Sequence, residues 1–436
     1  MTQSLALAGF ATDFSSDALP PALKDLAARS VFSAASAALA ALGDGQNRAI
    51  LATLADLSPN SAIGVFGGEW RFDPLNAAFA NGFLANALDF DDTHQGTILH
   101  PTAPVLGTVT ALAEHLGASP TEAMTAFTLG VEIACRIADA VSPEHYDRGW
   151  HITSTCGVFG AAAAAGRLLR LTQAEMLWAF GHAAAQAAGT VENLGTSAKS
   201  IGVGQAARGG LFAALLARRG VAGPARPLEG KLGWLSLVAE GPRLVALTKD
   251  LGQDWSFARN MLKPYPCGVV LNPVLEAALC LHAELPAPER ITRIELRGHP
   301  LLKARTDRPE ARGAREMQVC AQHAVSAALL RGRFGPEEVS EAAAADPAIL
   351  ALRAKVAPLQ IIEGVTIDAA EISVISTSGT LTRRIEAAKG SLSKPLGWAD
   401  LEAKAAGVTP RAQQLRRFCE GLWDEVPLTA VTDFAP

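Results

Sequence analysis

The chain has 436 residues, of which 49% are hydrophobic and 19% charged, and its formal net charge is -5. That length allows two or three domains with large apolar cores, and the lack of a basic stripe argues against nucleic acid as the main partner. We find no charge-free apolar run of the roughly 18 residues that suggest a membrane span. The first residues lack the basic start of a signal peptide, so we expect a cytoplasmic protein.

The cysteines do not form a metal-binding framework. Six are scattered along the chain, and no pair has the Cys-x-x-Cys spacing typical of zinc ribbons or iron–sulfur sites. The sequence also lacks the glycine-rich motifs that bind dinucleotides or nucleotide phosphates. We therefore expect neither a metal nor a cofactor.

Helical periodicity dominates the first 250 residues. The pattern predicts helices at 17–42, 46–56, 73–88, 103–116, 120–140, 153–170, 172–189, 202–219 and 240–251. Residues 63–72 look like a short strand or a loop. Many of these stretches are rich in Ala and Gly, and small residues allow helix axes to approach closely. We expect a multi-helix domain with nearly all-apolar helices at its centre.

The pattern changes near residues 255–270, where Pro264, Pro266 and Gly268 interrupt the chain. Alternating apolar and polar residues then predict strands at 290–297, 361–367, 370–376 and 380–386. Helical patterns lie at 273–283, 316–331, 347–355, 398–406 and 410–424. The sequence therefore predicts a mostly α fold, with a discontinuous helical domain (1–258 and 395–436) and an inserted α+β domain (259–394).

One loop stands out as a candidate site. Residues 89–101 read DFDDTHQGTILHP, which places three carboxylates and two imidazoles between two predicted helices. Asp, Thr, Gly and Pro between helices indicate a connecting loop, and the gathering of acids and histidines indicates a site. The alternative is that Asp91 or Asp92 caps a helix and that the histidines are solvated.

Four segments in order resemble the MmgE/PrpD family, which includes 2-methylcitrate dehydratases, cis-aconitate decarboxylases and an iminodisuccinate epimerase. They read LDFDDT…HPT (88–102), GWHITSTCGVFG (149–160), GTSAKSIGVGQAA (195–207) and KPYPCG (263–268). Each motif alone is weakly specific, but the four in this order are strong evidence for the resemblance. The resemblance implies a helical domain that forms a homodimer and a smaller domain that acts as a lid.

The resemblance also implies a set of site residues. The positions that match the family's active site are Asp89, Thr93, His100, His151, Lys199 and Lys263. We expect the two histidines near the reacting carbon, since imidazole titrates near neutral pH. The two lysines would clamp substrate carboxylates, and Asp89 would orient a neighbour or pair with its charge.

Three further residues complete the candidate set. Tyr146 is an alternative acid or base if a neighbour such as Lys199 lowers the pKa of its phenol. Asp92 and Tyr265 are candidate substrate-binding residues. For each candidate a structural role is the competing interpretation: a half-buried histidine with its hydrogen bonds satisfied, a surface lysine, a linker lysine at 263, or a tyrosine ring that only packs.

The chemistry suggested is cleavage of a C–H bond next to a carboxylate, which needs a base and nearby positive charge. The leading hypothesis is a metal-free lyase that dehydrates or decarboxylates a small di- or tricarboxylic acid. The second is an isomerase or epimerase that returns the same proton, as on an iminodisuccinate-type substrate. The third is a non-catalytic protein that binds a carboxylate or a partner on the same fold.

The chain departs from the citrate-type branch of the family at two places. Asn272 stands near the position where that branch usually has a histidine, and an amide cannot exchange a proton at neutral pH. Gln322 and His323 replace a more typical Ser-containing segment. These differences favour keeping the epimerase hypothesis beside the lyase hypothesis.

Overall fold

The computed structural model describes residues 2–58, 61–285 and 287–435. The described chain forms two units. The first comprises Met1–Ala87, Asp91–Asn260 and Leu401–Pro436, and the second comprises Leu88–Phe90 and Met261–Asp400. The mostly helical fold expected from the sequence is confirmed, and the discontinuous unit contains the longest helices.

Helices supply nearly all the regular structure of the first unit. The longer ones are α1 (Gln3–Asp13), α2 (Pro21–Ala41), α3 (Gly45–Leu57), α4 (Pro74–Asn86), α5 (Thr102–Leu116), α6 (Pro120–Val141), α8 (Ile152–Leu168), α9 (Gln173–Ala184), α10 (Ser197–Arg218), α19 (Trp398–Ala406) and α20 (Ala412–Glu420). The short elements are β1 (Ile63–Gly64), β2 (Arg71–Phe72), β3 (Asp92–His94), α7 (Glu144–Asp147), α11 (Trp234–Val238), α12 (Val245–Thr248) and α21 (Thr429–Thr432).

Two helix boundaries differ from the prediction for visible reasons. Helix α10 begins at Ser197 rather than 202, because the Thr196 side chain accepts a hydrogen bond from the backbone N–H of Ala198 and caps the helix earlier. The helix expected at 240–251 shrinks to α12, since the carbonyls of Ala246 and Lys249 are bound by the Arg136 side chain. Helix α1 was not predicted.

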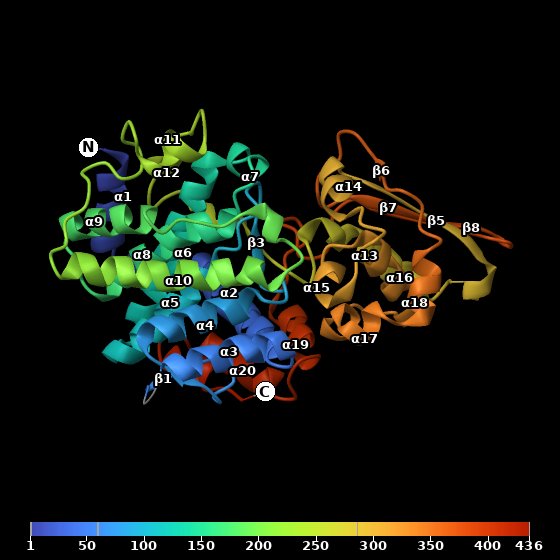
Figure 1. The fold of residues 1–436 in the computed structure, drawn as a ribbon, viewed down its shortest axis with the longest axis horizontal. Helices are drawn as coiled ribbons and strands as arrows, with labels where there is room; N and C mark the ends of the chain where they lie inside the picture. Colours follow the sequence, from blue (N-terminus) through green and yellow to red (C-terminus); the bar gives the residue numbers. More distant parts are fainter. Residues whose placement is uncertain (1, 59–60, 286, 436) are drawn as a thin grey trace. The chain divides into compact units, whose positions relative to one another are not determined.

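The centre of the first unit is built on small residues. Helices α4, α5, α8 and α10 pack on one another there, as Figure 1 shows. A Cβ atom on Gly107 of α5 would lie 2.5 Å from the backbone nitrogen of Gly82 and 2.6 Å from the carbonyl oxygen of Ala78, both on α4. The two backbones are therefore in direct contact, which any larger side chain at 107 would prevent.

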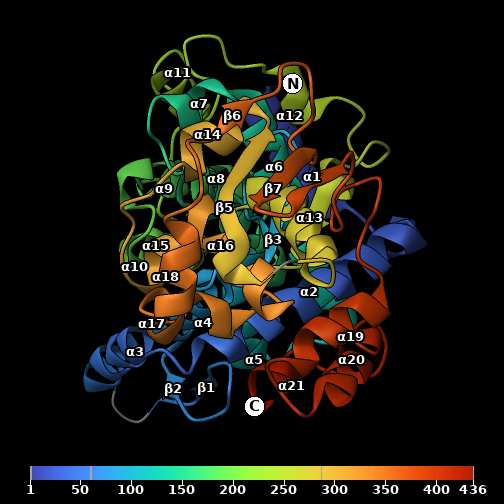
Figure 2. The ribbon, with the colours of Figure 1, turned by 90° about the vertical axis from the view of Figure 1, so that its right-hand side faces the viewer.

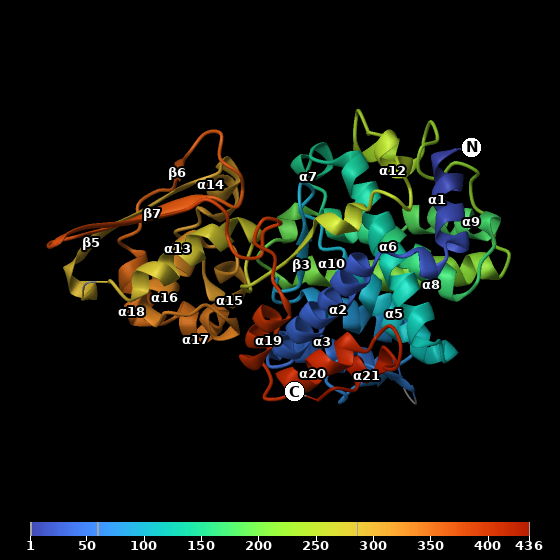
Figure 3. The same cartoon turned by 180° about the vertical axis from the view of Figure 1, so that it is seen from behind.

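The two ends of the chain meet in this unit. Helix α2 packs against α20, and Figure 3 shows the C-terminal helices in red beside α2 in blue. The Trp423 indole N–H donates to the carbonyl of Lys24 at 2.9 Å, and the Lys24 ammonium lies 5.2 Å from the centre of that ring. The last helices thus complete the domain that the first helices begin.

The second unit combines a four-stranded sheet with helices. Its strands lie in the order β6-β5-β7-β8, and β6 is parallel to β5 whereas the other pairs are antiparallel. Figure 2 labels β5, β6 and β7 of this sheet. Helix α13 packs on β7 and β8 and against α16. The elements are β4 (Asn260–Leu262), α13 (Asn272–His282), β5 (Ile291–Gly298), α14 (Pro300–Thr306), α15 (Gly313–Met317), α16 (Ala321–Arg331), α17 (Glu341–Ala344), α18 (Pro347–Arg353), β6 (Gln360–Ile361), β7 (Ala370–Ser376) and β8 (Gly379–Ile385).

Among the described helices, none alone is long and apolar enough to cross a membrane. The pair α2 and α3, bent by 94°, meets the length and composition criteria only when taken together.

Replacing Gly107 with Ala should destabilise the protein, because the new methyl group would collide with two backbone atoms of α4. We expect a loss of about 2 kcal/mol or more, as for other overpacked cores, measured by urea denaturation. Gly43→Ala is the matched control, since a Cβ there would meet no atom within 4 Å. Equal stability of the two variants would contradict the close packing of α4 and α5.

Candidate active site

The loop that follows α4 is held by its own histidine. Strand β3 turns at Gly96, whose φ of +82° suits glycine, and the chain returns so that His94 N–H donates to the carbonyl of Leu99 at 2.7 Å. The His94 ring meets the Thr97 hydroxyl at 2.8 Å and the carbonyl of Ser256 at 3.0 Å. Burial lowers the pKa of His94 to about 4, so this ring is neutral and braces the loop.

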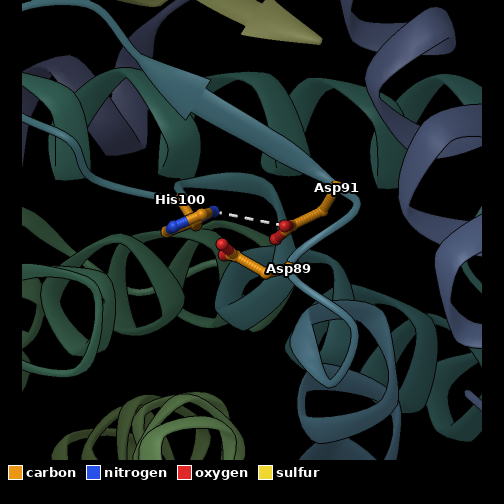
Figure 4. A group of neighbouring side chains, drawn as sticks. All are labelled: Asp89, Asp91 and His100. Carbon is orange, nitrogen blue, oxygen red and sulfur yellow. Dashed lines mark hydrogen bonds and ion pairs between the residues drawn. The ribbon is translucent and has the colours of Figure 1, made fainter. Parts of the chain in front are cut away.

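Asp91 and His100 form a buried pair across this loop. The His100 Nδ1 atom lies 3.2 Å from Asp91 Oδ1, and the Asn86 amide donates to Asp91 Oδ2 at 3.1 Å. Figure 4 shows the dashed line between the imidazole and the carboxylate. Asp91 is fully buried and His100 is 7% exposed. The histidines are therefore not solvated, and the His100 ring has a fixed orientation.

Asp92 points to a different set of partners. Its Oδ2 accepts from Thr102 N–H, the first residue of α5, at 3.3 Å and from the Asn260 amide at 2.7 Å. Asp92 thus caps α5 from the neighbouring strand. Burial, with a smaller effect of the Asp91 charge, raises the pKa of Asp92 to about 7. The Thr93 hydroxyl donates to the Asp92 carbonyl at 2.7 Å and is buried.

His151 stands directly before α8 and is oriented by the first turn of that helix. Its Nδ1 lies 2.7 Å from the Ser154 hydroxyl. Ser154 is crowded by two glycines, because a Cβ atom on Gly202 would lie 2.6 Å from the Ser154 oxygen and one on Gly189 would lie 2.7 Å from its Cβ. These glycines leave the room in which Ser154 meets the imidazole.

Lys199 lies in the first turn of α10 and is 9% exposed. The next residue ties this turn to α4, since the Ser200 hydroxyl lies 3.2 Å from both the carbonyl and the side-chain oxygen of Asn86. Asn86 in turn donates to Asp91. A continuous set of hydrogen bonds therefore runs from the Lys199 turn to His100.

His100 is also joined to the helix that follows His151. Its backbone N–H donates to the Thr153 hydroxyl at 3.0 Å. Together with the network through Asn86, this bond ties the loop, the start of α8 and the first turn of α10 together. The first unit thus holds His100, His151 and Lys199 on elements that are fixed to one another.

Tyr146 lies on α7, half-buried, and its neighbour His145 has a structural role. The His145 ring stacks on Trp150 with centroids 5.8 Å apart, and its Nε2 lies 2.7 Å from the Thr155 hydroxyl. Burial lowers the pKa of His145 to about 4. The short helix α7 is thereby anchored to the first turn of α8.

Lys263 and Asp89 form an ion pair within the second unit. The Lys263 ammonium lies 3.0 Å from Asp89 Oδ1 and donates to the carbonyls of Asp89 and Cys267 at 3.2 and 3.1 Å. Lys263 is only 1% exposed. Of the two roles expected for Asp89, charge partner fits this geometry. Substrate clamping by Lys263 stays a prediction.

The remaining candidates of the second unit are placed by its fold. Tyr265 packs against the apolar core, and burial raises the pKa of its phenol. Asn272 is the buried first residue of α13. The Gln322 amide donates to Asp307 at 2.6 Å, and His323 Nε2 lies 2.6 Å from the Glu338 carbonyl. Gln322 and His323 therefore brace α16.

One group of described side chains has the spacing of a metal site. Asp89, Asp91 and His100 each offer a ligand atom, and these atoms lie within 4.8 Å of one another (Figure 4). Asp89 already meets the Lys263 ammonium, and Asp91 meets the Asn86 amide and the His100 ring. These partners already neutralise or bind both carboxylates, and the expectation of no metal stays a prediction.

Two family models together match most of the chain. Residues 5–246 match the MmgE/PrpD N-terminal domain and residues 265–417 match the MmgE/PrpD C-terminal domain. The chain belongs to the MmgE/PrpD family.

Relatives within the MmgE/PrpD family include proteins named cis-aconitate decarboxylase. The one from Homo sapiens is 31% identical over 353 residues, which cover 77% of this chain and 72% of the relative. The one from Mus musculus is 30% identical over 372 residues, which cover 80% of this chain and 74% of the relative. A cis-aconitate decarboxylase-like protein from Aspergillus oryzae is 29% identical over 228 residues, or 49% and 47% of the two chains.

Sequence reasoning missed the residues that orient the MmgE/PrpD candidates. Asp91 was considered only as a helix cap, yet it binds the His100 ring. Asn86 and Ser200 looked like ordinary helix residues, and nothing in their spacing links them. Ser154 carried a usable signal, because a hydroxyl three residues after a histidine at a helix start can reach back to its ring.

Stability should fall as pH rises from about 4 to 7 because of Asp92. Its folded pKa of about 7 lies above the unfolded value near 3.9, so the folded state retains a proton that the unfolded state has lost. Asp92→Asn cannot ionise, so between pH 5 and 8 it should lose about 2 kcal/mol less stability than wild type. Urea denaturation at both pH values, with the exposed Asp56→Asn as control, tests this. An unchanged pH dependence would contradict a protonated Asp92.

Proposed function

We propose that the protein is a lyase that acts on a small tricarboxylic acid of the cis-aconitate type. The observation that carries the proposal is the buried Asp91–His100 pair, tied by Asn86 and Ser200 to the turn that holds Lys199. Such an array supplies a fixed acid–base group and a cation on one rigid scaffold. The family and its named decarboxylase relatives support this choice of reaction class.

His100 is the proposed proton-transfer group. Its Nδ1 faces the Asp91 carboxylate, which selects the tautomer with the proton on Nδ1 and stabilises the imidazolium once it forms. We assign the exchange of a proton with the substrate to Nε2. Imidazole titrates near neutral pH and can therefore serve as base or acid in turn.

Lys199 is the proposed partner of a substrate carboxylate. Charge builds up on the substrate when a bond next to a carboxylate breaks, and a nearby ammonium stabilises it. His151, held by Ser154, is the second proposed acid–base group. We retain Thr93, Asp92, Tyr146, Tyr265, Lys263 and Asp89 as candidate residues of secondary rank.

The proposed reaction balances in either of its forms. In decarboxylation the bond to the leaving carboxylate breaks, carbon dioxide departs, and the electron pair left on carbon takes a proton from the histidine. In dehydration the base removes the proton next to a carboxylate, the electron pair forms a carbon–carbon double bond, and the hydroxyl group leaves as water with a proton from the second acid–base group. Lys199 offsets the carboxylate charge in both cases. We also propose that the protein works as a homodimer.

A proton NMR assay in D₂O tests the activity directly. The purified protein is given cis-aconitate, 2-methylcitrate, citrate and iminodisuccinate in separate samples. We expect a new alkene product with loss of carbon dioxide or water, and no product from Lys199→Ala. Deuterium at the α-carbon with inversion and no elimination would overturn the lyase proposal in favour of the epimerase. No reaction with any of the four acids would also count against it.

Replacing Asp91 with Asn should lower turnover by about 100-fold or more, because the amide can neither fix the same tautomer nor stabilise the imidazolium. The measurement is kcat of the active substrate, with the thermal unfolding midpoint recorded for each variant. Asp56→Asn, an exposed change on α3, removes the same charge and should keep full turnover. A folded Asp91→Asn protein with wild-type kcat would contradict the role of the pair.

A further inference from the structure

A cavity lies in the first unit, between α6 and the segment 243–259, and none of its lining residues belongs to the candidate active site. Its volume is about 460 Å³, which is within the range of small-molecule sites. Its lining carries four cations and two carboxylates: Arg136, Arg243, Lys249, Arg259, Asp139 and Asp254. Positive charge is therefore in excess around this space.

On one side of the cavity the lining is buried, and its charge is already paired. Arg136 is 3% exposed and pairs with the fully buried Glu132 at 2.5 Å. Its guanidinium also donates to the carbonyls of Ala246, Lys249 and Asp254, which wraps the segment 243–259 around it. Glu132 accepts from two backbone N–H groups of the same segment, at 3.1 and 2.7 Å. The Arg136 guanidinium is therefore fully engaged and offers no unpaired positive charge to a ligand.

The other three cations of the lining have fewer carboxylate partners. Arg259 pairs with Asp139 at 2.5 Å and donates to the Ser256 hydroxyl at 2.9 Å. Arg243 donates only to main-chain carbonyls, those of Asp139 and Ser142. In the described part of the chain, neither Arg243 nor Lys249 has a carboxylate within ion-pair distance. Two positive charges therefore border the cavity without a carboxylate at ion-pair distance among the described residues.

We propose that this cavity binds a small dianion, held by Lys249 and Arg243 with Arg259 at its edge. Arginine and lysine form strong charge-assisted hydrogen bonds with phosphate and carboxylate oxygens. With Arg136 paired to Glu132, the other three cations still outnumber Asp139 and Asp254, and a dianion would meet the two that have no carboxylate partner in the described chain. Phosphate groups and small dicarboxylates share this chemistry, and the experiment separates them.

The site would act through stability rather than chemistry. The Ser256 hydroxyl at its edge donates to Asp139 at 2.6 Å, and the Ser256 carbonyl meets the His94 ring, which ends β3. An anion that bridges Arg243 and Lys249 would hold the segment 243–259 against α6. Because a ligand bound only to the folded state stabilises it by mass action, occupancy should raise the unfolding temperature.

The test is calorimetric titration of the full chain with inorganic phosphate, at constant ionic strength set with sodium chloride. We expect saturable binding and a rise in the unfolding temperature. Lys249→Gln should weaken binding about 5-fold, and Lys249→Glu should weaken it further. The Lys249 side chain is exposed, and the bond with Arg136 uses the Lys249 backbone carbonyl, which both variants keep, so both should fold. Lys231→Gln removes an exposed lysine elsewhere and should bind like wild type.

Succinate distinguishes the two kinds of dianion. It is titrated into wild type, Lys199→Ala and Lys249→Gln, because a dicarboxylate could also enter the candidate active site. Loss of succinate binding in Lys249→Gln alone would assign a dicarboxylate to the cavity. Equal affinity of wild type and Lys249→Glu for phosphate and for succinate, or no saturable binding of either, would overturn the proposal. Neither result bears on the lyase assay.

Discussion

The candidate site depends on the hydrogen bonds that surround the buried Asp91 carboxylate. A buried carboxylate is costly unless hydrogen-bond donors surround it, and Asp91 meets the Asn86 amide and the His100 ring, while its carbonyl accepts from the Ser33 hydroxyl at 2.8 Å. Those partners come from α4, the loop and α2. The same contacts that satisfy the buried charge thus fix the histidine, so stability and orientation have one source.

The small residues of the helical core make that arrangement possible. Contact between the backbones of α4 and α5 at Gly82 and Gly107, and the room that Gly202 leaves for Ser154, allow helix starts to converge. With larger residues the axes would move apart, and the hydrogen bonds from Ser200 to Asn86 and from His100 to Thr153 would lengthen beyond use. The Ala- and Gly-rich composition therefore positions the candidate site residues as well as packing the core.

Much of the fold could be read from the sequence, because apolar periodicity directly reports which helix faces are buried. Helices α2 to α6 and the strands β5, β7 and β8 lie where the pattern predicted them. The strand expected at 361–367 is mostly absent, since only Gln360–Ile361 pairs with β5. Local pattern does not encode such pairing, which depends on residues far along the chain.

The candidate site was predictable to a lesser degree. Motif resemblance drew attention to His100, His151 and Lys199, whose burial and partners the structure supplies. It could not show that the Asp91 carboxylate meets His100 Nδ1, because neighbouring carboxylates in one loop differ only in direction. The helix cap considered for Asp91 or Asp92 is made by Asp92, and the motif could not choose between the two residues. Side-chain direction is set by the register of β3, which no linear motif specifies.

The meeting of α2 and α20 has a consequence for how the protein is made. During synthesis the second unit leaves the ribosome before α20 does, whereas the first unit still lacks the helices that cover Lys24. Domains tend to fold as units while the chain grows. The second unit can therefore fold first. The first unit, although its first helices are made earlier, cannot complete its fold until α20 covers α2.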